Sequence, residues 1–192
     1  IKNGNWLREE HRGIELEGKK VGIIGYGNMG KSFAKKLHGF DVKKVIFHDL
    51  LDLGNDPYAS QVSLDELKSE VDVLSLHTPQ TELTKGMIDK SFIDQMGRNF
   101  WLLNTARGSS VLTDALVYGL KSGKILGAGL DVLEYESSSF ENIFHSQINN
   151  PSFSYLIDAE NVLLSPHVAG WSIESHQKLA QIISDKICSE FV

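Results

Sequence analysis

Residues 20–30 read KVGIIGYGNMG, and they are the strongest indication of fold in the sequence. Residues 21–24 form an apolar run typical of a buried strand, and a helical pattern begins at Asn28. In such a unit the first glycine permits a tight turn, the second lets a pyrophosphate approach the backbone, and the third lets the helix pack on the strand. The helix N-terminus attracts the anion. The stretch therefore predicts a phosphate-binding turn made of Gly25, Tyr26, Gly27, Asn28, Met29 and Gly30.

Apolar runs and helical patterns alternate along the rest of the chain. The runs are rich in Val, Ile and Leu and predict buried parallel strands, and the patterns between them predict helices. This alternation is typical of βαβ units, so we expect an α/β fold, a Rossmann-type doubly wound parallel sheet with helices on both faces. The expected strands are 21–24, 45–47, 71–76, 100–103, 126–130 and 162–164, and the expected helices are 28–37, 63–69, 89–96, 113–121 and 173–191.

Helix signals and irregular segments refine this expectation. The pattern Ser63-x-x-Glu66 predicts a capping box, and Thr113 is expected to cap the helix that Gly123 closes. Residues 5–10 resemble the tail of a helix and the chain opens without Met, so we expect upstream sequence, with a linker helix over 1–12 and a closing helix over 173–192 that packs on another domain. Residues 137–158 are expected to form an irregular surface excursion, either a wall of the site or a subunit contact.

Composition excludes several classes of function. The net charge of -6 argues against a nucleic-acid surface, because phosphate binding needs clustered Lys and Arg. One cysteine, Cys188, cannot form an internal disulfide, and no Cys and His residues have zinc-ligand spacing, so we expect no metal and a reducing compartment, the cytoplasm. No apolar run approaches the roughly twenty residues that span a bilayer, so we expect no membrane partner.

Asp49 ends the second expected strand, about twenty residues beyond the last glycine of the turn, where a carboxylate can bind ribose hydroxyls. This position favours NAD over NADP, because Asp49 would repel a 2′-phosphate and no Arg follows closely to compensate. The alternative is an aspartate that only caps a turn.

Charged residues follow three later strands. Arg107 comes after the strand at 100–103, Asp131, Glu134 and Glu136 come after 126–130, and His167 comes after 162–164. Carboxyl ends of parallel strands share one edge, so a cation, an acid and an imidazole should converge there. Imidazole suits the proton exchange that alcohol oxidation requires, a carboxylate would orient it, and Arg107 could hold a carboxylate or ketone oxygen. Taken singly, each has a simpler interpretation: a solvated arginine, a wet acidic loop, a turn-forming aspartate.

Five segments in this order resemble the D-isomer-specific 2-hydroxyacid dehydrogenase family. They are VGIIGYGNMG at 21–30, LHTP at 76–79, LNTARG at 103–108, GLDV at 129–132 and SPHVAG at 165–170. The resemblance implies an NAD-binding domain over residues 1–192 in which Arg107 binds substrate, His167 is the acid-base group and Glu136 supports it. It also places Asp131 near the nicotinamide and Thr78 and Pro79 beside the adenosine half. The expected cofactor site further includes His77, Thr105, Ala106, Arg107, His167 and Gly170.

Two departures from the family pattern leave the acidic partner of His167 open. Leu133 stands where the family usually has an aromatic residue, and Ser137 stands where a proline usually follows the glutamate. Glu134 and Glu136 are therefore both candidates, and the spacing from Asp131 favours Glu136.

The resemblance also implies a reaction and partners. The substrate would be a small 2-hydroxy acid, with a phosphoglycerate dehydrogenase-like member preferred and erythronate 4-phosphate, glycerate and hydroxypyruvate left open. A different class is an NAD-sensing corepressor-like interaction protein. The family suggests a homodimer. It builds its substrate-binding domain largely from N-terminal sequence, which we expect to be missing from this chain. We therefore expect the fragment alone to bind NAD and to turn over poorly.

Overall fold

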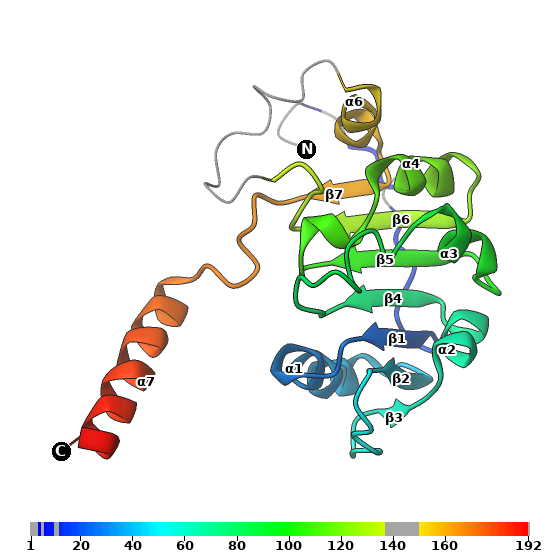
Figure 1. Cartoon of the computed structure of the whole chain (residues 1–192). Coiled ribbons are helices and arrows are strands. Elements are labelled where there is room, and N and C mark those ends of the chain that lie inside the picture. The colour runs from blue at the N-terminus through cyan, green and yellow to red at the C-terminus, as the bar shows by residue number, and fades with distance from the viewer. Residues whose placement is uncertain (1–3, 5, 10–11, 137–149, 192) are drawn as a thin grey trace.

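Seven strands form one sheet in this computed structural model, which describes residues 4, 6–9, 12–136 and 150–191 (Figure 1). The strand order is β3-β2-β1-β4-β5-β6-β7, and every neighbouring pair is parallel. The order reverses between β1 and β4, which is where a doubly wound sheet opens a crevice. The strands are β1 Lys20–Ile24, β2 Lys44–His48, β3 Ser60–Gln61, β4 Val73–Leu76, β5 Phe100–Asn104, β6 Ile125–Leu130 and β7 Val162–Leu164.

Helices cover both faces of the sheet and bury two separate apolar clusters. The larger cluster joins α2, α3, α4 and α6 to one face, and the smaller one joins α1 to the other. Successive side chains of β2 point to opposite faces of the sheet and so contribute to both clusters. Ile46 belongs to the larger cluster, while Val45 and Phe47 belong to the smaller one. The helices are α1 Asn28–Leu37, α2 Leu64–Glu70, α3 Lys90–Gln95, α4 Thr113–Lys121, α6 Pro151–Asp158 and α7 Ile173–Phe191, with 3-10 turns η1 His38–Phe40 and η2 Gly108–Ser110. The expected doubly wound α/β fold is confirmed.

The start of α4 differs from the prediction. Leu112, not Thr113, is the N-cap residue, and it makes no side-chain cap. The backbone N–H of Thr113 instead donates to Glu134 Oε2 over 2.6 Å. The cap comes from a loop distant in sequence, which a search for local capping residues cannot find.

The expected irregular excursion is partly wrong. Pro151–Asp158 forms α6, because Asn150 Oδ1 accepts the backbone N–H groups of Ser152 and Phe153 over 3.0 and 3.2 Å, and Pro151 supplies a preset first turn. Phe153 and Leu156 are both buried, and Leu156 belongs to the larger cluster, so α6 packs against the sheet. The remainder of the expected excursion, 137–149, lies outside the described residues.

The helices predicted at the two ends of the chain agree with the structure to different extents. Of the described residues in the expected linker helix, Trp6 and Leu7 have no regular structure, and Arg8 and Glu9 form a turn, so no helix is present there. The closing helix α7 is present and extends away from the sheet with its apolar residues exposed (Figure 1). None of the helices in the described ranges combines the length and the apolar character that a membrane crossing requires.

A substitution at Ser63 tests the helix cap that the sequence predicts. Its Oγ accepts the N–H of Glu66 over 3.1 Å and caps α2. We expect Ser63→Ala to lower the free energy of unfolding by about 1 kcal/mol, because an N–H at the helix N-terminus loses its acceptor. Urea denaturation measures this loss. Ser63→Asp keeps an acceptor and is the matched control, and equal stability of the alanine variant would contradict the cap.

Candidate active site

The loops that follow β1, β4, β5, β6 and β7 meet along one edge of the sheet, because parallel strands present their carboxyl ends together (Figure 1). Backbone hydrogen bonds join successive loops to the end of the neighbouring strand. They run from His77 N to Ile24 O (2.8 Å), from Asp131 N to Asn104 O (2.9 Å) and from Ser165 N to Leu130 O (3.0 Å). The loops therefore form one continuous rim.

The three glycines of the first loop have three different geometries. Gly25 has a φ of 89°, and a Cβ there would lie 2.8 Å from the carbonyl of His77. A Cβ on Gly30 would lie 2.3 Å from Gly25 O, so only glycine lets the helix pack this closely. A Cβ on Gly27 would meet nothing within 4 Å. Gly27 therefore faces open space, as a position that a pyrophosphate approaches must.

The first turn of α1 leaves its N–H groups available. Its N-cap residue is Gly27, which has no side chain to cap them, and Asn28 and Met29 are exposed. The Tyr26 side chain is buried, so this residue offers only its backbone to the crevice. The arrangement fits an anion at the helix N-terminus.

Asp49 is held close to this turn. Its Oδ2 accepts the backbone N–H of Tyr26 over 2.7 Å, and its Oδ1 accepts that of Leu51 over 3.0 Å. Each carboxylate oxygen has a further lone pair, so the carboxylate can fasten the turn and still accept a ligand hydroxyl.

The loop after β4 brings His77, Thr78 and Pro79 against the glycine turn. Thr78 Oγ1 is buried and has no hydrogen-bond partner among the described residues, which suits an atom that a ligand satisfies. The ring of His77 contacts Phe33 of α1, and its Nε2 lies 2.9 Å from Ser75 Oγ. Burial lowers the pKa of the His77 imidazole from 6.5 to about 4, so the ring is neutral at pH 7.

Arg107 is presented on a loop that Asn104 shapes. The buried Asn104 side chain donates to Arg107 O and accepts from Ala106 N, both over 3.1 Å. Ala106 is buried, whereas Thr105 and Arg107 are exposed on the rim. The Arg107 guanidinium donates to Ala106 O over 2.6 Å and has no ion-pair partner within the described ranges. A cation so placed can bind an anionic substrate group.

A close backbone contact joins this loop to the next one. A Cβ on Gly108 would lie 1.9 Å from Leu133 O, so the chain at 108 must be glycine for the two loops to touch. Leu133 in turn donates its N–H to Glu136 Oε1 over 2.7 Å. The arginine loop and the glutamate loop therefore share one packed contact.

Glu136, and not Glu134, lies against His167. The distance from His167 Nδ1 to Glu136 Oε2 is 2.9 Å, while Glu134 turns away to cap α4. The Glu136 carboxylate is thus bonded at both oxygens, which fixes its direction toward the ring. His167 itself has a φ of 54°, and its N–H donates to Asp131 O over 2.8 Å. A strained backbone at a rim residue is typical of a functional position.

Asp131 fixes the loop that carries the histidine. Its carboxylate accepts from Ser165 Oγ (2.6 Å), Val168 N (2.8 Å) and Ala169 N (2.8 Å). Burial alone would raise the pKa of the Asp131 carboxyl, but these hydrogen bonds and the nearby His167 together lower it below its ordinary value. Gly170 follows on the exposed side, where its carbonyl accepts from Ser175 Oγ.

The sequence interpretation gave no role to Asn104, Gly108 and Ser165. All three lie in or beside the quoted segments, yet their partners, respectively the 106–107 backbone, Leu133 and Asp131, are known only from the folded chain. The sequence offered one signal for them, which is their position at or shortly after the end of a strand. Among the described residues, no group of three or more His, Cys, Asp and Glu side chains is arranged to hold a metal ion.

A family model described as "D-isomer specific 2-hydroxyacid dehydrogenase, NAD binding domain" matches residues 1–169. The chain belongs to this family. The match covers every loop of the rim described above, from the glycine turn to the histidine. The three glycine geometries and the uncapped helix N-terminus fit the dinucleotide that the family is named for.

Curated relatives of this dehydrogenase family domain carry several names. The chain is 37% identical over 189 residues to a D-3-phosphoglycerate dehydrogenase of Haemophilus influenzae, and the match covers 97% of the chain and 43% of that protein. It is 34% identical over 190 residues to a hydroxypyruvate reductase of Thermotoga maritima, covering 99% of the chain and 58% of that protein. The chain thus spans about half the length of the curated relatives it matches.

A solved structure shows the same fold. The NAD-complexed form of a D-isomer specific 2-hydroxyacid dehydrogenase from Lactobacillus delbrueckii ssp. bulgaricus matches with a TM-score of 0.81 and 31% identity. The match covers 98% of this chain and 59% of that one. Nearly all of this chain is therefore similar in structure to somewhat more than half of that longer protein.

A substitution at Gly27 tests cofactor binding separately from stability. We expect Gly27→Ala to leave stability unchanged, because the new Cβ meets no atom of the chain, and to weaken NADH binding about tenfold or more, because it occupies the space that a pyrophosphate needs. Fluorescence titration with NADH and thermal unfolding measure the two effects. Gly39→Ala is the matched control, since a Cβ there also meets nothing but lies on η1, away from the glycine turn. Unweakened NADH binding by the Gly27 variant would refute the assignment.

The lowered pKa of His77 predicts that the free energy of unfolding depends on pH. The unfolded chain takes up a proton near pH 6.5, whereas the folded imidazole stays neutral until about pH 4. The stability that follows from the neutral buried ring is therefore complete above pH 6.5 and is lost as the pH falls toward 4. Between pH 7 and pH 4 we expect the unmodified chain to lose about 3 kcal/mol more free energy of unfolding than His77→Gln. Parallel denaturation curves at both pH values measure this difference, and identical losses would contradict it.

Proposed function

We propose that this chain is the NAD-binding and catalytic half of an NAD-dependent dehydrogenase that acts on a D-2-hydroxy acid or its 2-oxo acid. The observation that carries the proposal is the 2.9 Å pair of His167 and Glu136 on the same rim as the glycine turn and Arg107. A proton-exchanging group, a cation and a dinucleotide site along one edge are what oxidation of a hydroxy acid requires.

The cofactor would be held by the loops after β1, β2 and β4. The N–H groups at the start of α1 suit the pyrophosphate, and Asp49 suits the adenosine ribose hydroxyls. Thr78 Oγ1, for which the described residues supply no hydrogen-bond partner, suits a polar cofactor atom. Asp49 also supports NAD over NADP, because its carboxylate repels a 2′-phosphate. When bound, the nicotinamide supplies the hydride donor or acceptor.

The chain's own residues manage charge and protons. Arg107 binds the substrate carboxylate through its guanidinium, which fixes the substrate's orientation. His167 takes the hydroxyl proton at Nε2 during oxidation and returns it during reduction. Glu136 accepts a hydrogen bond from Nδ1–H, holds the ring in place and stabilises the imidazolium that forms when the proton arrives. Asp131, which fixes the loop, would lie near the nicotinamide.

The complete enzyme requires a second unit, in this proposal. The relatives are about twice as long as the chain, and a closed, water-poor site needs a surface opposite the rim. Residues 1–192 would then bind NADH and turn over poorly alone, and the exposed apolar face of α7 would pack on that second unit. We also propose a homodimer, following the family, and a cytoplasmic location, following the single cysteine. Light scattering measures the oligomer.

The substrate class is a carboxylate beside a hydroxyl or carbonyl. A relative named for D-3-phosphoglycerate and another for hydroxypyruvate share that feature, and the first is our preferred substrate. A panel of D-3-phosphoglycerate, D-glycerate, hydroxypyruvate and erythronate 4-phosphate, assayed by NADH absorbance in a chain that carries both units, tests the assignment. Absence of turnover on every member of the panel would count against it.

The two glutamates provide a matched pair of variants for catalysis. In a chain that carries both units, assayed by NADH absorbance, we expect His167→Asn to lower kcat at least about a hundredfold while NADH still binds. Glu136→Gln should lower kcat roughly tenfold, because the ring loses its negative partner. Glu134→Gln is the control: it weakens only the α4 cap and keeps kcat. If Glu134→Gln proves as damaging to kcat as Glu136→Gln, the assigned role of the pair is wrong.

A further inference from the structure

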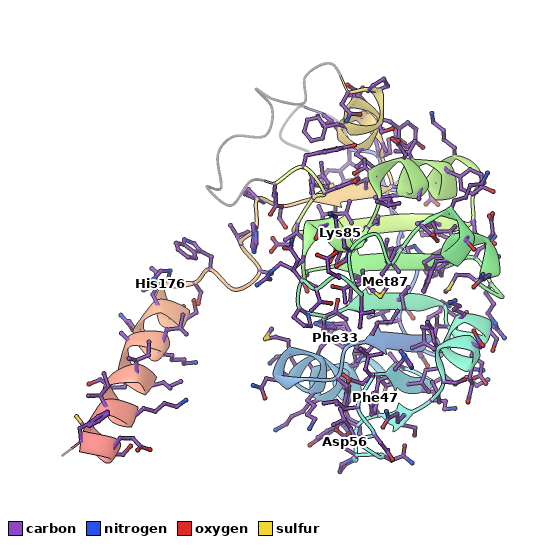
Figure 2. All side chains as sticks on the ribbon, in the orientation of Figure 1. Phe33, Phe47, Asp56, Lys85, Met87 and His176 are labelled. Atoms are coloured by element: carbon purple, nitrogen blue, oxygen red, sulfur yellow. The ribbon has the colours of Figure 1, made fainter. Side chains whose placement is uncertain are left out.

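Tyr26, the residue between the first two glycines, directs its side chain into the protein. It is 1% exposed and stacks on Phe47, with ring centroids 3.6 Å apart and an interplanar angle of 9°. Its hydroxyl donates to Asp56 Oδ2 over 2.7 Å. Phe47 and Asp56 lie together at the β2 and β3 end of the sheet (Figure 2). The phosphate-binding turn is thus tied through a side chain to a loop about thirty residues away along the chain.

Asp56 organises the loop that it belongs to. Its Oδ1 accepts the N–H groups of Tyr58 and Ala59 over 2.8 and 3.0 Å, which closes the turn that leads into β3. Burial alone would raise the pKa of the Asp56 carboxyl, but the bonds from Tyr26, Tyr58 and Ala59 lower it overall, and burial beside Asp56 raises the pKa of the Tyr26 hydroxyl. At neutral pH the tyrosine is therefore the donor and Asp56 the charged acceptor.

The segment between Asp49 and Asp56 carries an apolar surface next to the ribose site. Leu50 and Leu51 are 78% and 66% exposed directly after Asp49. Gln61 Nε2 donates to Leu51 O over 2.7 Å, and Leu53 N donates to Gln61 Oε1 over 2.8 Å. We name residues 50–56 the leucine segment. It is fastened to β3 through Gln61 and to the glycine turn through Asp49 and the Tyr26–Asp56 bond.

We infer that Tyr26 and Asp56 are a positioning pair, which holds the leucine segment at the separation from the glycine turn that the adenosine half of the cofactor needs. This rests on the proposed function. A purine joined to a ribose diol suits an apolar surface beside a carboxylate, and the pair fixes that surface relative to the pyrophosphate site. Tyr26 acts through the loop and does not itself touch the cofactor with its side chain.

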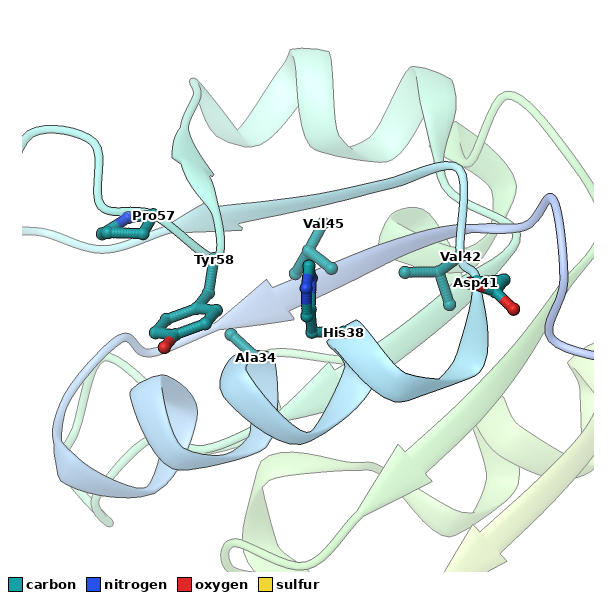
Figure 3. Close-up of a pocket in the computed structure, with 7 residues that line it drawn as sticks. All are labelled: Ala34, His38, Asp41, Val42, Val45, Pro57 and Tyr58. Carbon is teal, nitrogen blue, oxygen red and sulfur yellow. The ribbon is translucent and has the colours of Figure 1, made fainter.

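Tyr26→Phe isolates the hydrogen bond from the packing. The phenylalanine ring keeps the stack on Phe47, and only the donor to Asp56 Oδ2 is removed. Tyr58→Phe is the matched control. Tyr58 lies beside a small pocket between α1 and β2, with its ring edge-on to His38 at 6.2 Å, and its hydroxyl has no hydrogen-bond partner within the described part of the chain (Figure 3).

The experiment titrates residues 1–192 and the variants with NADH by fluorescence and with ADP-ribose by calorimetry. We expect Tyr26→Phe to weaken both ligands by the same factor, about five- to tenfold, because ADP-ribose contains the whole adenosine half. Asp56→Asn should weaken them similarly, and the double variant should weaken them no further than the stronger single variant, since both remove one interaction. Tyr58→Phe should bind both ligands as the unmodified chain does.

Several outcomes overturn the inference. Unchanged dissociation constants in Tyr26→Phe, with only a lower Tm, would mean that the bond stabilises the fold alone. Weaker NADH but unchanged ADP-ribose would mean that the bond does not act on the adenosine half. If Tyr26→Phe fails to fold, the same comparison is made with Asp56→Asn. Failure of the unmodified chain to bind NADH would overturn the proposed function, and this inference with it, whereas the other outcomes leave the proposed function standing.

Discussion

The candidate active site depends on the hydrogen bonds that the Asp131 carboxylate accepts. It accepts hydrogen bonds from Ser165, Val168 and Ala169, on both sides of His167 in the chain. The histidine has a φ of 54°, which costs a residue with a Cβ roughly 1–2 kcal/mol. Hydrogen bonds to a charged acceptor are strong enough to offset that cost. Asp131 therefore keeps the imidazole aimed at Glu136, although it ends a different strand from the histidine.

Close backbone contacts at glycines extend the same principle along the rim. Gly25 lies against the His77 carbonyl, Gly30 against Gly25, and Gly108 against Leu133. At each of these positions a Cβ would displace a neighbouring part of the rim. The rim is therefore a set of mutually fixed loops, in which the position of Arg107 depends on the path of the glutamate loop and the position of the phosphate turn depends on the loop after β4.

The two glutamates of one short loop have different partners. They flank Tyr135 in the chain, yet Glu136 pairs with His167 while Glu134 supplies the cap that α4 lacks. One short loop thus sets the ring orientation and satisfies a helix terminus. Tyr26 divides its roles in the same way, since its backbone belongs to the phosphate turn and its side chain belongs to the core and to Asp56.

The parallel α/β sheet, the glycine turn and the order of charged residues after the strands were predictable from the sequence, because periodicity and glycine spacing act between near neighbours. Ser63 was foreseen as a helix cap for the same reason. The folded chain was needed to show that Glu136 rather than Glu134 faces His167, that Glu134 caps α4 and that Tyr26 reaches Asp56. These contacts join residues about 20 to 31 positions apart, and their geometry is set by how strands lie beside one another in the sheet, which no local pattern encodes.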